Sequence, residues 1–297
     1  MFSKRFLNLL FVGCLSAASW GLQYNLDEAL GTDPNDITYI AGDANGFSPH
    51  PPEMTIAAIE FPRSVNWFAT ATVIAPNYVI TAAHWKTILK SDYPNWPLGY
   101  KLKRLGGQTL TTEYMIVDEQ HHFGNDAMVC RIKKTNPTDP NFNPATWRKL
   151  SDPNFAAIAE IYDGNDEAGR AVTIGCFGKI EKYNKPWCEC TPEERNSKIK
   201  RVKIPGTLHW GRNVIDIMTP PTAKSPMIGF RYDPIGSPRY VQFEACGTEG
   251  NSGSPWFIQD GEGSWKLAGF FTSCTTGPRL SGNRDLIAAM IAYMDKQ

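Results

Sequence analysis

Short runs of apolar and β-branched residues recur along the chain from residue 53 onward, and Pro, Gly and Asn separate them. Repeated short runs with turn residues between them are typical of β-sandwiches and β-barrels, so we predict an all-β chain. The expected strands lie at residues 55–61, 68–76, 78–84, 114–119, 127–132, 171–177, 240–245 and 266–271.

A stretch rich in Pro and Asn, residues 134–147, separates two groups of these runs. We interpret it as part of a connection between two domains. The expected boundaries are residues 53–150 for a first β-unit and 151–297 for a second, with residues 22–52 as an N-terminal extension or propeptide.

The C-terminal residues 283–297 have a helical pattern instead. Asn283 suits the N-cap position and Asp285 suits the first turn. The helix is expected to pack on the β-structure rather than to bind a cofactor. Its apolar residues recur at a spacing of four: Leu286, Met290 and Met294.

The first residues have the order of a secretory signal peptide. Lys4 and Arg5 come first, an apolar run follows from Phe6 to Leu15, and small residues come next. We therefore predict a signal peptide over residues 1–21 and a secreted protein. A buried core helix is one alternative, and lipid attachment at Cys14, which would require a bacterial source, is another.

Composition narrows the classes of partner. The chain has 42% hydrophobic residues, which is ample for a packed core, and 30 basic residues balance 30 acidic ones. A formal charge of zero gives no indication of a nucleic-acid partner or of an anionic membrane surface, so neither is expected.

Cysteine usage fits an exported chain. Without Cys14, an even set remains, which allows up to three disulfides with a pairing that the sequence leaves open. A zinc site is the alternative for Cys188 and Cys190, but the two-residue ligand gap and a nearby histidine are lacking, so no metal and no cofactor are expected. The set is Cys130, Cys176, Cys188, Cys190, Cys246 and Cys274.

The segment GTEGNSGSPWF, residues 247–257, places Ser252 among turn-forming residues. It could be an ordinary tight loop, since Gly, Ser, Asn and Pro all favour turns. It could also present a serine nucleophile together with its own N–H group. A nucleophilic serine would need a base and a carboxylate that orients the base.

Two residues have the context for these roles. His84 follows the strand-like run YVITAA, and Asp126 opens the run AMVCRI. A lone histidine is more often structural, and a lone aspartate at the edge of a strand is more often a solubilising group. Their order along the chain, His84 then Asp126 then Ser252, favours a catalytic role for both residues.

The motifs TAAH at His84, DAMV at Asp126 and GNSGSP at Ser252 together resemble those of chymotrypsin-type serine peptidases. The resemblance covers roughly residues 40 to 295. It implies two antiparallel β-barrels with a C-terminal helix and an active site between the barrels. His84 would be the general base and acid, Asp126 its orienting group and Ser252 the nucleophile. By the same resemblance, the N–H groups of Gly250 and Ser252 would form the oxyanion hole.

The chain departs from the animal members of that family. Trp85 stands where a bracing cysteine is usual, and Asn251 stands where an acidic residue precedes the nucleophile. The motif GNSGS is closer to the glutamyl-endopeptidase and other microbial branches. Because an amide at position 251 gives a buried ammonium no anionic partner, we expect activity not to depend on a free amine at Ile40.

The resemblance also places the substrate. Phe271, Thr272 and Ser273 resemble the strand that lines the primary specificity pocket, with Thr272 making a backbone contact to substrate. Position 271 is phenylalanine rather than histidine, and the segment EACGTEG contains no aspartate. Both features favour a substrate with an uncharged side chain at the cleavage site. Cys246 and Cys274 flank this pocket, and we predict a disulfide between them.

The expected activity is a secreted serine endopeptidase acting on a protein or peptide substrate. The protein is expected to be a monomer that a protein inhibitor could restrain. Two other interpretations remain: a catalytically silent homologue that serves as a binding or effector module, and a structural β-sandwich with no site.

Overall fold

The structure is a computed structural model of the chain. It describes residues 19–20, 24–25, 51, 55–60, 68–76, 78–84, 100–106, 109–123, 126–134, 158–176, 182–183, 209–233, 237–241, 244–247 and 250–296.

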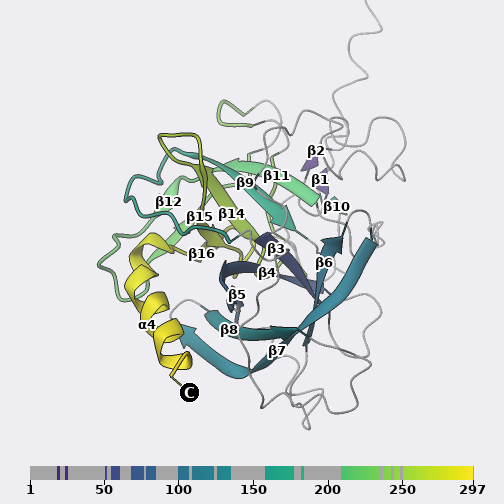
Figure 1. The fold of residues 1–297 in the computed structure, drawn as a ribbon. Helices are drawn as coiled ribbons and strands as arrows, with labels where there is room; N and C mark the ends of the chain where they lie inside the picture. Colours follow the sequence, from purple (N-terminus) through teal and green to yellow (C-terminus); the bar gives the residue numbers. More distant parts are fainter. Residues whose placement is uncertain are drawn as a thin grey trace, which may run out of the picture.

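The described chain is mostly β-sheet and ends in one helix, which confirms the prediction of an all-β chain with a C-terminal helix (Figure 1). The 3₁₀ turn η6 (Ser281–Asn283) leads directly into the helix α4 (Arg284–Met294). The strands are β1 (Ser19–Trp20), β2 (Tyr24–Asn25), β3 (Ile56–Glu60), β4 (Phe68–Ala75), β5 (Tyr78–Ala82), β6 (Tyr100–Gly106), β7 (Thr109–Phe123), β8 (Ala127–Lys134), β9 (Ala171–Cys176), β10 (Lys182–Tyr183), β11 (His209–Val214), β12 (Ile217–Met218), β13 (Met227–Gly229), β14 (Pro255–Gln259), β15 (Trp265–Phe270) and β16 (Thr276–Pro278).

The first six-stranded group closes on itself. Its strands pair in the order β3-β4-β5-β8-β7-β6, and β6 pairs back with β3, all antiparallel. Every residue of β5 is buried, so this strand lies at the centre of the packing rather than at an edge. His84 and Asp126 lie just outside the ends of β5 and β8, which are neighbours in this group.

The later strands form separate sheets. One has the order β11-β9-β14-β15, and a smaller one has the order β12-β13-β16. The short strand β10 pairs instead with β1, which also pairs with β2. Among the described residues these sheets do not join into a second closed ladder, so the second barrel stays a prediction. The expected connection at residues 134–147 lies outside the described residues apart from Lys134, the last residue of β8.

Direct hydrogen bonds join the two strand groups. The Thr70 N–H in β4 donates to the Ser252 carbonyl at 3.0 Å, and the Ser254 hydroxyl donates to the Thr70 hydroxyl at 3.2 Å. Nearby, the Ala159 N–H donates to the Val73 carbonyl at 2.8 Å. The loop that carries Ser252 is therefore fixed against the strand group that carries His84 and Asp126.

The C-terminal helix packs on the first strand group, beside β7 and β8 (Figure 1). The Arg131 guanidinium from β8 donates to the Met294 carbonyl at 3.2 Å. The Tyr78 hydroxyl from β5 donates to the Asp295 carboxylate at 2.9 Å. The buried Arg131 cation satisfies a carbonyl in the last turn of α4 and interacts favourably with the helix dipole. These two hydrogen bonds hold the end of α4 against β5 and β8, the strands next to His84 and Asp126.

The apolar face of α4 differs from the predicted one. Leu286 is 44% exposed, whereas Ile287 is buried with Met294. The prediction that Leu286 belongs to the buried face is wrong. An α-helix has 3.6 residues per turn, so residues spaced strictly four apart move gradually away from the buried face. Asn283 does occupy the N-cap position, but its side-chain amide donates to the Arg279 carbonyl at 2.8 Å instead of capping the helix.

One predicted strand is not observed. In the segment 240–245, Tyr240, Val241, Glu244 and Ala245 are described, and none belongs to a named strand. The Glu244 N–H donates to the Val241 carbonyl at 3.0 Å, which bends the chain into a turn, and only an isolated bridge joins Glu244 to Arg212. The predicted strand is therefore not observed at the described residues of this segment.

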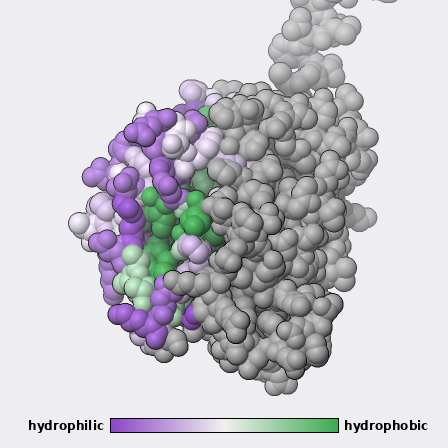
Figure 2. All heavy atoms as spheres, in the orientation of Figure 1, coloured by the Kyte–Doolittle hydropathy of each residue, from purple (hydrophilic) through white to green (hydrophobic). Residues whose placement is uncertain are grey.

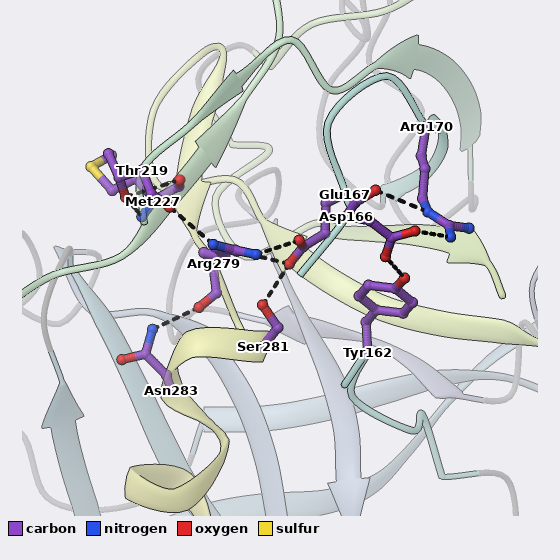
Figure 3. Close-up of polar contacts among 9 residues, drawn as sticks. All are labelled: Tyr162, Asp166, Glu167, Arg170, Thr219, Met227, Arg279, Ser281 and Asn283. Carbon is purple, nitrogen blue, oxygen red and sulfur yellow. Dashed lines mark hydrogen bonds and ion pairs between the residues drawn. The ribbon is translucent and has the colours of Figure 1, made fainter. Parts of the chain in front are cut away.

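A buried ion pair joins Glu167 to Arg279, which lies just before η6 and α4 in the chain (Figure 3). Two guanidinium nitrogens of Arg279 donate to the two carboxylate oxygens of Glu167, at 2.9 and 2.6 Å, and both side chains are fully buried. Arg279 also donates to the Thr219 carbonyl at 3.1 Å, and the Ser281 hydroxyl donates to Glu167 at 2.5 Å. Every charge in this buried cluster therefore has a partner.

The described surface is mixed in character. Figure 2 shows an apolar area bordered by hydrophilic residues on the visible described face. Within the described ranges, the large hydrophobic side chains that are exposed are Ile217, Met218, Leu286 and Tyr293. No helix among those ranges has the length and apolar character needed to cross a membrane.

Candidate active site

The backbone brings His84 and Asp126 together. Ala82 and Ala127, the last residue of β5 and the first of β8, are paired across the ladder. One step further, the Ala83 N–H donates to the Asp126 carbonyl at 2.8 Å. Residues that continue two paired strands past the same edge must stay close, so the two side chains meet there.

Asp126 has an unusual backbone conformation. Its φ is 62°, and it is the one residue other than glycine in the described ranges with a positive φ. Aspartate tolerates the left-handed region better than most residues, and such conformations cluster at functional sites. This turn directs the carboxylate toward His84.

The three candidate residues form one hydrogen-bonded chain. Nδ1 of His84 is hydrogen-bonded to Oδ2 of Asp126, and Nε2 of His84 lies 2.6 Å from the hydroxyl oxygen of Ser252. About a third of the His84 and Asp126 side chains is exposed, at 33% and 35%, and Ser252 is partly buried. The nucleophile candidate, its base and its orienting acid therefore meet at one partly open place.

Two glycines shape the loop around Ser252. Gly250 and Gly253 have φ values of 92° and 82°, which residues with a side chain rarely adopt. A Cβ atom on Gly253 would also collide with the Thr70 carbonyl and the Thr81 hydroxyl of the first strand group. Glycine at 253 lets the loop approach β4 and β5 closely enough for Ser252 to reach His84.

The expected oxyanion donors are in this loop. In the part of the chain that the structure describes, the N–H groups of Gly250 and Ser252 donate to no other residue. Their neighbours are engaged: the Gly253 N–H donates to the Phe271 carbonyl at 2.8 Å, and the Ser254 N–H donates to the Asn251 carbonyl at 3.0 Å. The two predicted donors thus remain available to a substrate oxygen.

Sequence reasoning did not identify Cys176 as part of the site. The side-chain amide of Asn251, the residue before Ser252, donates to the Cys176 sulfur at 2.7 Å. Both residues are buried, and Cys176 is the last residue of β9. The strand itself was predicted, but no local pattern relates its final residue to a loop so far along the chain.

The predicted substrate-binding residues separate into two groups. Phe271 is 1% exposed and packs edge-on against Phe230 and Trp256, at centroid distances of 5.7 and 5.0 Å. Its side chain is therefore part of the core, and a direct side-chain contact of Phe271 with substrate is not supported. Thr272 is partly exposed and Ser273 is exposed.

Thr272 and Ser273 begin a tight turn between β15 and β16. Their N–H groups both donate to the Thr276 carbonyl, at 3.2 and 3.1 Å. Among the described residues, no N–H donates to the Thr272 carbonyl, which leaves that oxygen available for the predicted backbone contact to substrate.

Cys246 and Cys274 are both buried and lie on adjoining segments. The Gly247 N–H, directly after Cys246, donates to the Cys274 carbonyl at 2.7 Å. The structure contains no disulfide among the cysteines that it describes. The proximity is what the predicted pairing requires, and the disulfide itself stays a prediction.

Glu244 is a buried carboxylate that sequence reasoning passed over. Its two oxygens accept the backbone N–H groups of Asp233 and, at 3.1 Å, Val241. Burial raises the pKa of Glu244 to about 7, and the two N–H donors only partly oppose this shift. Through these two hydrogen bonds, Glu244 links Asp233 to Val241.

No group of three or more His, Cys, Asp or Glu side chains in the described ranges is arranged to hold a metal ion. Ile40, Trp85, Cys14 and the cysteine pair at 188 and 190 lie outside those ranges. No protein-family model matches the chain, and a search of curated proteins found no match.

Proposed function

We propose that this protein is a secreted serine endopeptidase of the chymotrypsin type, with a second β-barrel completing the fold. The observation that carries the proposal is the hydrogen-bonded chain from Asp126 through His84 to the Ser252 hydroxyl. A structural β-sandwich would have no need for a serine, a histidine and a carboxylate in this order on three separate segments.

The geometry supports acyl transfer to water. His84 Nε2, 2.6 Å from the Ser252 oxygen, can take the hydroxyl proton as that oxygen attacks a peptide carbonyl. The Nδ1–H group of His84 donates a hydrogen bond to the Asp126 carboxylate, which holds the ring in the required tautomer and stabilises the imidazolium that forms. The same imidazolium then protonates the leaving amine, and a water molecule releases the acyl group by the reverse sequence.

Charge on the carbonyl oxygen has its own stabilising groups. The N–H groups of Gly250 and Ser252 are the proposed donors, and neither donates a hydrogen bond to another described residue. Loss of one such donor typically costs about 2.7–4 kcal/mol of transition-state stabilisation. The shape of this loop therefore makes its own contribution to the proposed rate, beside that of the triad.

A fluorophosphonate probe tests the proposal directly. Labelling followed by peptide mapping should give one covalent adduct, at Ser252, on the purified mature protein. Ser252→Ala should give none, and it should also fail to digest casein. A wild-type protein that carries no adduct and releases no peptides would instead be the silent binding module.

A further inference from the structure

Asn251 lies between the two proposed oxyanion donors, Gly250 and Ser252. A trans peptide unit is planar, with its carbonyl and its N–H pointing in opposite directions. The Ser252 N–H shares its peptide unit with the Asn251 carbonyl, which accepts the Ser254 N–H at 3.0 Å. The direction of the Ser252 N–H therefore depends on where Asn251 is held.

A second anchor holds Asn251 through its side chain. The side chain is 1% exposed, and its amide donates to the Cys176 sulfur at 2.7 Å. Cys176 is fully buried at the end of β9, which is paired with both β11 and β14. A strand in the interior of a sheet is a rigid support, whereas the loop from Gly250 to Gly253 has two glycines that would otherwise let it change conformation.

We propose that Cys176 is a positioning residue for the oxyanion loop, acting through the Asn251 side chain. This inference rests on the proposed function and names the group that keeps the proposed site in its working conformation. The anchor is an amide–thiol contact within the core of the fold. It is consistent with the expectation that no free amine at Ile40 is needed.

Single substitutions separate this role from simple packing. Cys176→Ala should lower kcat about tenfold or more on a defined fluorogenic peptide, because the Ser252 N–H is no longer fixed, while KM changes less than about twofold. Cys176→Ser keeps a hydrogen-bond acceptor and should restore kcat to within about threefold. Rates are divided by the amount of fluorophosphonate-reactive protein.

Cys130→Ala is the matched control. Cys130 is also fully buried, in β8, but it supports the other strand group. Its removal should lower the thermal midpoint to a similar degree and leave kcat within about twofold of wild type. If Cys176→Ala does not fold, Cys176→Val, which removes the acceptor and leaves no cavity, is compared with Cys176→Ser.

A double-mutant cycle with Asn251→Ala completes the test. If Cys176 acts through Asn251, the double variant loses no more kcat than Asn251→Ala alone. The proposal is overturned if folded Cys176→Ala keeps wild-type kcat, or if the two losses multiply. A wild-type protein with no adduct at Ser252 would overturn the proposed function as well, so the two failures are distinguishable.

Discussion

The N–H of Ala83, the residue before His84, donates to the carbonyl oxygen of Asp126 at 2.8 Å. The segments that carry His84 and Asp126 are thus joined through the backbone as well as through the two side chains. Because a backbone bond survives side-chain substitution, changes at His84 or Asp126 should alter the chemistry of the site without separating the two segments.

We expect Ser252→Ala and His84→Ala each to lower kcat by about 10⁴-fold or more, because the triad residues act as a unit. Asp126→Asn should lose about 10⁴-fold by favouring the wrong tautomer of His84. Hydrolysis of a casein-derived peptide measures the loss, and urea midpoints near wild type show that the fold is intact. Wild-type turnover in any of the three would contradict the triad assignment.

Gly253→Ala should unfold the protein or lower its stability by about 4 kcal/mol or more, because the new Cβ meets Thr70 and Thr81. Gly263→Ala is the control: it has the same φ of 82° and nothing within 4 Å of the added carbon. That change should cost about 1–2 kcal/mol, the strain of the backbone alone. Equal losses in urea unfolding would show that the close approach of the loop to β4 is unimportant.

Removing one partner of the Glu167–Arg279 pair should be costly. Glu167→Ala leaves a fully buried guanidinium without its carboxylate and should lower stability by about 3–5 kcal/mol. Glu160→Ala breaks an ion pair whose carboxylate is 71% exposed and should cost about 0–1 kcal/mol. Replacing Glu167 and Arg279 together by Met should recover most of the loss, and a double variant as unstable as the single one would argue against this account.

Glu244 should make stability depend on pH. Its pKa is raised from 4.5 to about 7 in the folded protein, so the folded state keeps a proton that the unfolded state releases. The stabilisation is complete below pH 4.5 and is lost as the pH rises toward about 7. Urea unfolding across this window should show a smaller slope with pH for Glu244→Gln than for wild type. Identical slopes would mean that Glu244 does not titrate there.

Cys246 and Cys274 should be recovered as one disulfide-linked peptide pair when the protein is digested without reduction. The hydrogen bond from the Gly247 N–H to the Cys274 carbonyl holds the two segments side by side. A disulfide requires its two cysteines to lie this close in space. Reduction before digestion is the control and should separate the two peptides. A map that joins either cysteine to Cys130 would rule out this pairing.

Local pattern alone determined much of this protein. Short apolar runs predicted seven of the named strands, and Asn283 and Asp285 marked the start of α4. The seven are β3, β4, β5, β7, β8, β9 and β15. The residues His84, Asp126 and Ser252 were also identifiable from their short motifs. These features depend on neighbours a few residues away, which is the range over which strand and helix periodicities and turn propensities act.

Only the tertiary structure decided which distant residues meet. Ser252 reaches His84 across 168 positions of the chain, and Asn251 reaches Cys176 across 75. The same packing buries Phe271 in an aromatic cluster and leaves Leu286 exposed. It also places the Glu244 carboxylate within hydrogen-bond distance of the Val241 N–H. Such contacts follow from how sheets and loops pack in space, and one sequence carries no local signal for them because a residue's partner can lie anywhere along the chain.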